Sequence, residues 1–131
     1  MALQGVNHVG LAVADLDEAV ATYERLFGAE VERRAEGGGL VGAMMRVGSG
    51  RVELLGSDDA ETPIGKFLAK RGPGMHHIAY STDDIRADLA ALRGRGVELI
   101  DAEPRLGLFA HEIAFAQPDS VHGVLTELVA V

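Results

Sequence analysis

The sequence lacks cysteine and tryptophan, and only 5% of its residues are aromatic. Without cysteine there is no disulfide framework and no thiolate chemistry. No apolar run approaches the roughly 20 residues that cross a bilayer as a helix. The amino terminus also lacks the basic start and long apolar segment of a signal peptide. We therefore expect a cytoplasmic protein that makes no use of a membrane.

Basic residues are scarce as well. The 12 Lys and Arg are outnumbered by 20 Asp and Glu, which gives a net charge of -8. Proteins that bind nucleic acid present basic surfaces, so this class is excluded. Two local basic clusters, Arg33–Arg34 and Lys66–Arg71, are compatible with the phosphates of a small ligand, although a solvated surface is the commoner role of such clusters. The expected partner is a small-molecule substrate.

The sequence contains an internal repeat, which is found by aligning His8 with His77. Each histidine begins a short apolar run, and an aspartate follows it seven residues later. Further pairs of residues then coincide: Val9 with Ile78, Leu11 with Tyr80, Asp15 with Asp84, and Val20 with Leu89. After a one-residue gap Gly28 matches Gly96, and at the far end RVELLG aligns with LTELVA, so that Glu53 matches Glu127. The repeat indicates two copies of one structural unit.

Each copy reads as a βαβββ unit. In the first copy, Asp15 caps a helix that Gly28 ends, and strands are expected at 6–13, 29–34, 40–47 and 51–55. In the second, a helix at 84–93 lies among strands expected at 76–81, 97–100, 111–116 and 124–129. Thr62 and Pro63 mark the start of a linker helix of about two turns, because proline favours the first helical position.

These elements predict an α+β fold in which the two modules form one domain. With 131 residues, the chain suits one domain better than two. A module of about 60 residues is marginal alone, so the modules should complete one another. We predict a single domain over 1–131, with a first module at 1–57, a linker helix within 58–73 and a second module at 74–131.

Strand alternation places each repeated histidine among small residues. Side chains two positions apart share a face of a strand. His8 therefore shares its face with Gly10 and Ala12, and His77 shares its face with Ala79 and Ser81. These small residues leave room beside each imidazole.

The repeated glutamates supply two further ligands. Glu53 and Glu127 lie in strands with apolar flanks, and a buried carboxylate is costly unless it is paired or binds a metal. With His8 and His77 they form a candidate set for a divalent ion such as Co, Ni, Zn, Mn or Fe. Three further histidines fall outside this set: His76 points to the opposite face, whereas His111 and His122 have no repeat partner and are expected to be exposed.

The sequence resembles a known superfamily. The HVGLAV and HHIAY strands, each paired with a glutamate strand, resemble the vicinal oxygen chelate superfamily. Within it, TPIGKFLAKRGPGMHHIAY, LRGRGVELIDAEPRLG and HGVLTELV resemble the methylmalonyl-CoA epimerase family. The resemblance implies one cupped mixed sheet around a metal that His8, Glu53, His77 and Glu127 bind. It also implies a homodimer.

The resemblance further implies an isomerase that acts on an acyl-CoA thioester. Removal of the α-proton of a thioester requires stabilisation of the enolate, which a divalent cation on the carbonyl oxygen provides. A carboxylate then takes the proton as general base. In the family this base falls on Glu127, which is also a metal ligand.

The chain departs from the family at Gly42. The second acid/base of epimerases, a glutamate, falls on this position, and glycine cannot carry a proton. Three hypotheses follow: an epimerase in which another residue such as Glu36 replaces the base, a single-base isomerase or glyoxalase-like lyase that acts on a less charged substrate, and a small-molecule binding protein. Gly42 favours the second hypothesis, and acidic Asp119 and the apolar segment Leu108–Ala110 make the expected substrate site less suited to an anionic ester. The sequence similarity favours the first hypothesis, the epimerase-like isomerase, which is our prediction. The complete ligand set opposes the third.

Overall fold

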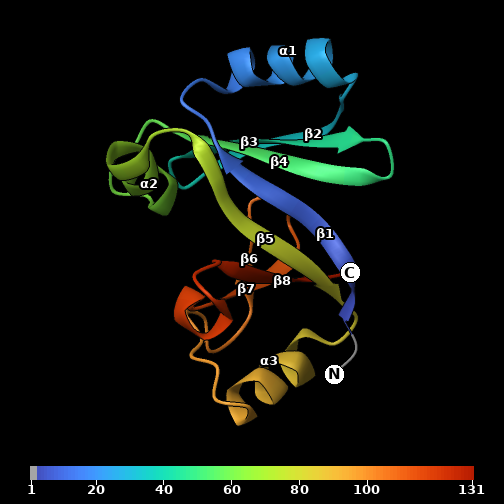
Figure 1. Ribbon diagram of the computed structural model, residues 1–131, viewed down its shortest axis with the longest axis vertical. Helices are drawn as coiled ribbons and strands as arrows, with labels where there is room; N and C mark the ends of the chain where they lie inside the picture. Colours follow the sequence, from blue (N-terminus) through green and yellow to red (C-terminus); the bar gives the residue numbers. More distant parts are fainter. Residues whose placement is uncertain (1–2) are drawn as a thin grey trace. The chain divides into compact units, whose positions relative to one another are not determined.

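The computed structural model describes residues 3–131, which form an α+β fold (Figure 1). The strands in this range are β1 (Leu3–Ala12), β2 (Glu30–Gly37), β3 (Leu40–Val47), β4 (Gly50–Ser57), β5 (Gly74–Thr82), β6 (Arg105–Leu106), β7 (Glu112–Ala116) and β8 (Thr126–Ala130). The helices are α1 (Leu16–Phe27), α2 (Pro63–Arg71), α3 (Ile85–Gly94) and a short 3-10 helix (Pro118–Val121). None of these helices is long and apolar enough to cross a membrane.

The strands hydrogen-bond in the order β2-β3-β4-β1-β5-β8-β7-β6, as a mixed sheet. The pairs β1–β4 and β5–β8 are parallel, whereas β2–β3, β3–β4, β6–β7 and β7–β8 are antiparallel. The two copies therefore repeat the same parallel pairing, which confirms the predicted fold class. Contacts divide the chain into two compact units, His8–His76 and His77–Val131 with Met1–Asn7. Whether they act as a single domain stays a prediction.

The unit at His8–His76 is organised around α1, which packs on β3 and β4 (Figure 1). The Asp15 side chain caps the helix by accepting a hydrogen bond from the Glu18 amide at 3.1 Å. Gly28 ends the helix in the left-handed region at φ 63°, where glycine is favoured. Buried residues under the helix form the core: Val20, Ala29, Ala43, Met45 and Leu54. Both predicted helix boundaries are confirmed.

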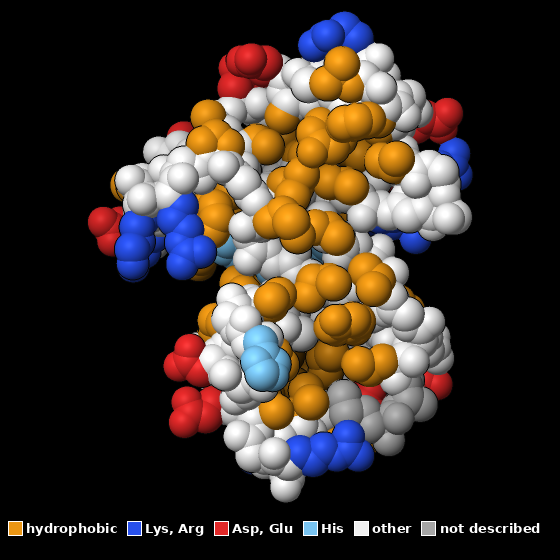
Figure 2. All heavy atoms as spheres, in the orientation of Figure 1, with side chains coloured by type: hydrophobic (Ala, Val, Ile, Leu, Met, Phe, Trp, Pro, Cys, Tyr) orange, Lys and Arg blue, Asp and Glu red, His pale blue; other side chains and the backbone are white. Residues whose placement is uncertain are grey.

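The linker helix α2 lies in the same unit and starts as predicted. Thr62 caps it by accepting from the Gly65 amide at 2.9 Å, and Pro63 occupies its first turn. A side chain at Gly65 would lie 2.2 Å from the Asp59 carbonyl oxygen, so this close approach requires glycine. Figure 2 shows Lys and Arg side chains gathered over α2, where Lys66–Arg71 ends in exposed basic residues.

The unit that contains His77–Val131 repeats this plan. Asp84 caps α3 by accepting from the Ala87 amide at 3.1 Å. Helix α3 packs on β7 and β8 over a core of Ile85, Leu89, Ala114 and Leu128. Thr82 is fully buried, and its hydroxyl donates to the buried carboxylate of Asp88. The hydrogen bond satisfies both groups, so neither destabilises the core.

The prediction of a strand at 97–100 is wrong. That segment contributes only an isolated bridge, Leu99 with Ala116, and the edge strand of this unit is the two-residue β6. The physical reason is Asp101, whose carboxylate accepts the Phe115 amide at 2.9 Å. The side chain thus takes a hydrogen bond that a backbone carbonyl would otherwise accept, which interrupts the ladder.

Candidate functional site

His8 and Glu53 meet on neighbouring strands of the unit at His8–His76. Glu53 on β4 lies opposite Gly10 on β1, so both share the face of His8. The exposed fractions of His8 and Glu53 are 3% and 7%, and His8 Nε2 lies 3.5 Å from Glu53 Oε1. Ala12 is buried on the same face. The predicted small-residue surroundings of His8 are therefore present.

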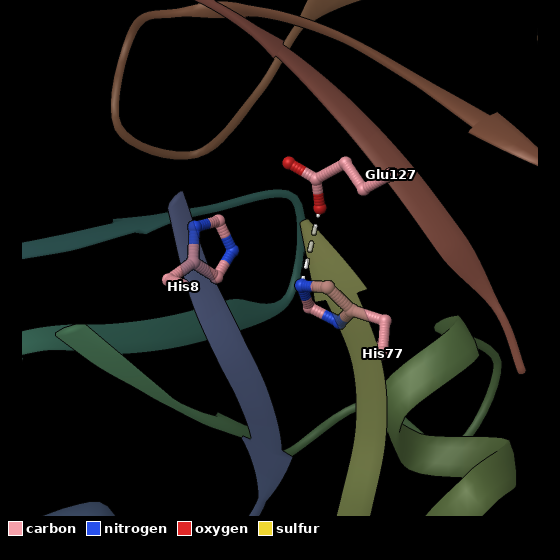
Figure 3. A group of neighbouring side chains, drawn as sticks. All are labelled: His8, His77 and Glu127. Atoms are coloured by element: carbon pink, nitrogen blue, oxygen red, sulfur yellow. Dashed lines mark ion pairs between the residues drawn. The ribbon is translucent and has the colours of Figure 1, made fainter. Parts of the chain in front are cut away.

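His77 and Glu127 make the equivalent pair in the other unit (Figure 3). Glu127 on β8 lies opposite Ala79 on β5, as Glu53 lies opposite Gly10. The exposed fractions of His77 and Glu127 are 3% and 4%, and His77 Nε2 lies 3.1 Å from Glu127 Oε2. Figure 3 draws this pair together with His8, which projects from β1.

The geometry of each pair fits two ligands of one metal ion. With metal–ligand bonds of about 2.1 Å, neighbouring ligands lie about 3.0 Å apart at a right angle and about 3.4 Å apart in a tetrahedral arrangement. The observed separations are 3.1 Å for His77–Glu127 and 3.5 Å for His8–Glu53. Imidazole and carboxylate are also the donor types of divalent transition metals. The distance within each pair is therefore compatible with two ligands of one metal ion.

The other histidines lie away from these pairs, as expected. His76 is half-buried and packs edge-on against Phe67 of α2, with ring centroids 5.1 Å apart. His111 and His122 are exposed.

Gly42 and Glu36 lie on opposite faces of the sheet. Gly42 on β3 is buried and lies opposite Leu55 on β4. Because Leu55 and Glu53 are two positions apart on β4, Gly42 shares the face of Glu53. Glu36 on β2 lies opposite Val41, which faces α1. A bulge between Val31 and Arg33 causes this placement, because strict alternation from Val31 would have turned Glu36 to the Glu53 face.

The α1 face at Glu36 also bears a cavity of about 560 Å³. Its lining includes Asp15, Asp17 and Arg34, and Arg34 donates to Asp17 at 2.9 Å. Glu36 therefore belongs to an exposed charged surface beside α1. It does not replace the base that is missing at Gly42.

Three further residues, Phe115, Arg105 and Asp101, lie in the same unit as Glu127, and the sequence did not predict their placement. Phe115 on β7 lies opposite Glu127 and packs edge-on against His77, with ring centroids 5.4 Å apart. The Arg105 guanidinium lies 5.7 Å from the Phe115 ring centroid, and its Nε contacts Asp101 at 3.0 Å. A two-residue strand has no periodicity, so the sequence offered no signal for the placement of Arg105.

The chain matches the model of the Glyoxalase/Bleomycin resistance protein/Dioxygenase superfamily over residues 7–116. It is 33% identical over 130 residues to the ethylmalonyl-CoA/methylmalonyl-CoA epimerase of Cereibacter sphaeroides, covering 96% of this chain and 97% of that protein. A crystal structure of methylmalonyl-CoA epimerase from Mycobacterium tuberculosis superposes with a TM-score of 0.92 at 35% identity, over 98% of this chain and 88% of that one.

A further solved structure shows methylmalonyl-CoA epimerase in complex with methylmalonyl-CoA and NH4+. It has a TM-score of 0.93 and 38% identity, over 98% of this chain and 95% of that one. The chain therefore belongs to the Glyoxalase/Bleomycin resistance protein/Dioxygenase superfamily. Within it, the relatives and structural neighbours described above are methylmalonyl-CoA epimerases, which confirms the resemblance seen in the sequence.

Proposed function

We propose that this protein is a metal-dependent isomerase, similar to methylmalonyl-CoA epimerase, that abstracts a proton α to a carbonyl group. One observation carries the proposal: two buried His–Glu pairs occupy equivalent strands of the two copies. The similarity to epimerases along almost the whole chain supports it.

His8, Glu53, His77 and Glu127 would together hold one divalent ion. Each pair supplies two donors, whereas a catalytic metal is usually held by at least three protein ligands. The two pairs together would supply four donors, two imidazoles and two carboxylates, which are types that divalent metals bind. A bound divalent cation would supply a Lewis acid for the carbonyl oxygen of the substrate.

Glu127 would act as the general base. Its carboxylate is buried and can take the α-proton on an oxygen, provided the substrate carbon comes within hydrogen-bonding reach. His77 Nε2 lies 3.1 Å from Oε2 and limits the orientation of the carboxylate. Burial also excludes water, which strengthens electrostatic effects at the site.

A specific observation favours a second candidate function, single-base enolisation or glyoxalase-like lyase chemistry. On the face of Glu53, the strand positions around Gly42 carry no second carboxylate: they are Ala35, Met44 and Leu55. Further along β2, the carboxylates of Glu30 and Glu32 form ion pairs with Arg46 and Arg51 at 2.9 Å and 2.7 Å, away from Gly42. A substrate that needs one proton transfer on one face would suit this arrangement.

Deuterium exchange separates these functions. Metal-loaded protein is incubated in D2O with methylmalonyl-CoA, and the α-proton is followed by NMR while circular dichroism follows the configuration. We expect exchange of the α-proton. Exchange accompanied by inversion supports the epimerase, and exchange with retention supports the single-base function. Absence of exchange, with metal shown to be bound, rejects proton abstraction from this substrate.

A pair of matched variants tests the role of Glu127. Glu127→Gln removes the base, and exchange should slow by about 100-fold or more. Exposed Glu103 in the same unit provides the control, because Glu103→Gln makes the same chemical change away from the pair. Equal exchange rates in the two variants would contradict the assignment. Metal binding without exchange in the wild-type protein would favour the binding-protein hypothesis.

A further inference from the structure

Arg105 lies on the same face of its unit as Glu127. Arg105 on β6 is opposite Ile113 on β7, and Phe115, two positions further along β7, is opposite Glu127 on β8. Because residues two apart share a face, all four side chains lie on one side of these strands. From strand spacing, the Cα atoms of Arg105 and Glu127 are roughly 12 Å apart.

The Arg105 side chain is held in place, although it remains accessible. Asp101 Oδ1 contacts Nε at 3.0 Å, and the guanidinium lies over the Phe115 ring. Asp101 is itself fixed, because its Oδ2 accepts the Phe115 amide at 2.9 Å. The Arg105 side chain is 53% exposed. A guanidinium has five N–H donors, so the contact at Nε leaves donors for a second oxyanion.

We propose that Arg105 binds an anionic oxygen group of the substrate, either a carboxylate or a phosphate. This inference rests on the proposed function. In a protein with a net charge of -8, and on a face that bears Glu127, an anionic ligand needs a local cation. Arginine matches carboxylates and phosphates through paired hydrogen bonds. Arg105 therefore determines specificity by selecting substrates that carry an anion at a set distance from Glu127.

Calorimetric binding to metal-loaded protein tests this assignment with two ligands. Methylmalonyl-pantetheine carries the carboxylate without the nucleotide phosphates, and propionyl-CoA carries the phosphates without the carboxylate. In Arg105→Met, we expect about tenfold or greater loss of affinity for one of them, as for a hydrogen bond to a charged group. Loss with the pantetheine ester identifies the carboxylate, and loss with propionyl-CoA identifies the phosphate.

Arg86→Met provides the matched control. Arg86 also forms an ion pair in this unit, to Glu112 on β7 at 2.9 Å, but it projects from α3 on the other side of the sheet. The hydrogen bond from Arg86 lowers the pKa of Glu112 and the same bond raises the pKa of Arg86. The control thus removes one positive charge and one ion pair away from Glu127. Equal affinities of the two variants for both ligands would overturn the proposal.

Asp101 is a positioning residue for Arg105, and this role is tested by measuring ligand binding and the exchange rate separately. Asp101→Asn should weaken binding of the same ligand as Arg105→Met, while metal content and the exchange rate at saturating substrate stay unchanged. If the wild-type protein binds a ligand through Arg105 but exchanges no α-proton, the proposed function fails and this inference stands. If metal-loaded wild-type protein binds neither ligand, this inference is rejected as well.

Discussion

At the residue scale, Gly42 distinguishes this chain from the epimerase pattern. It is buried on the Glu53 face, at the position where the family resemblance places a second acid/base. Its φ is not positive, so the backbone accepts a side chain there. The departure therefore removes a chemical group and leaves the strand geometry intact.

Gly42→Glu should restore inversion. A carboxylate on the Glu53 face would add a second proton-transfer group, and such groups contribute about 100-fold or more to rate. We expect the ratio of inversion to exchange to rise at least tenfold, measured by circular dichroism and NMR on the same sample. Gly42→Gln, which adds the same bulk without a base, is the control. A ratio no higher than in that control would show that Gly42 does not limit the reaction.

At the scale of elements, the two copies cap their first helices in the same way. Asp15 and Asp84 each accept a backbone amide three residues later, at 3.1 Å in both cases. These caps were predictable because a capping aspartate has a clear sequence pattern. The edge of the second unit was not predictable, because Asp101 forms its contact to Phe115 across 14 positions of sequence.

Removal of either cap should destabilise the protein. Asp15→Ala and Asp84→Ala should each lower the free energy of unfolding by about 0.5–2 kcal/mol, because each leaves a helix amide without its acceptor. Urea denaturation measures the change. Glu24→Ala, at an exposed position in α1, should have a smaller effect. Variants as stable as the wild type would show that these caps do not matter.

The placement of Glu36 shows a second limit of sequence reasoning about elements. Period-two alternation along β2 is reversed by the bulge between Val31 and Arg33. A bulge depends on pairing with the next strand, here β3, and leaves little trace in local sequence. The face of a residue beyond such a bulge therefore requires the structure.

At the scale of the whole molecule, the repeat was the most informative feature of the sequence. It predicted the fold class and the equivalence of the two His–Glu pairs, because equivalent strands carry the same residue types at the same register. It did not predict Arg105, which has no partner in the first copy. Homodimer formation and a cytoplasmic location stay predictions from the sequence and its resemblance.

The central claim is that the four repeated residues bind one ion. Elemental analysis of purified, metal-loaded protein tests it most directly, with His8→Ala and His77→Ala as variants and exposed His111→Ala as control. We predict one divalent ion per wild-type chain, a strong loss in both paired variants, and full retention in the control. Full metal occupancy in the His8→Ala or the His77→Ala variant would contradict the claim. Two ions per wild-type chain, with one of them lost in each of these variants, would contradict it as well.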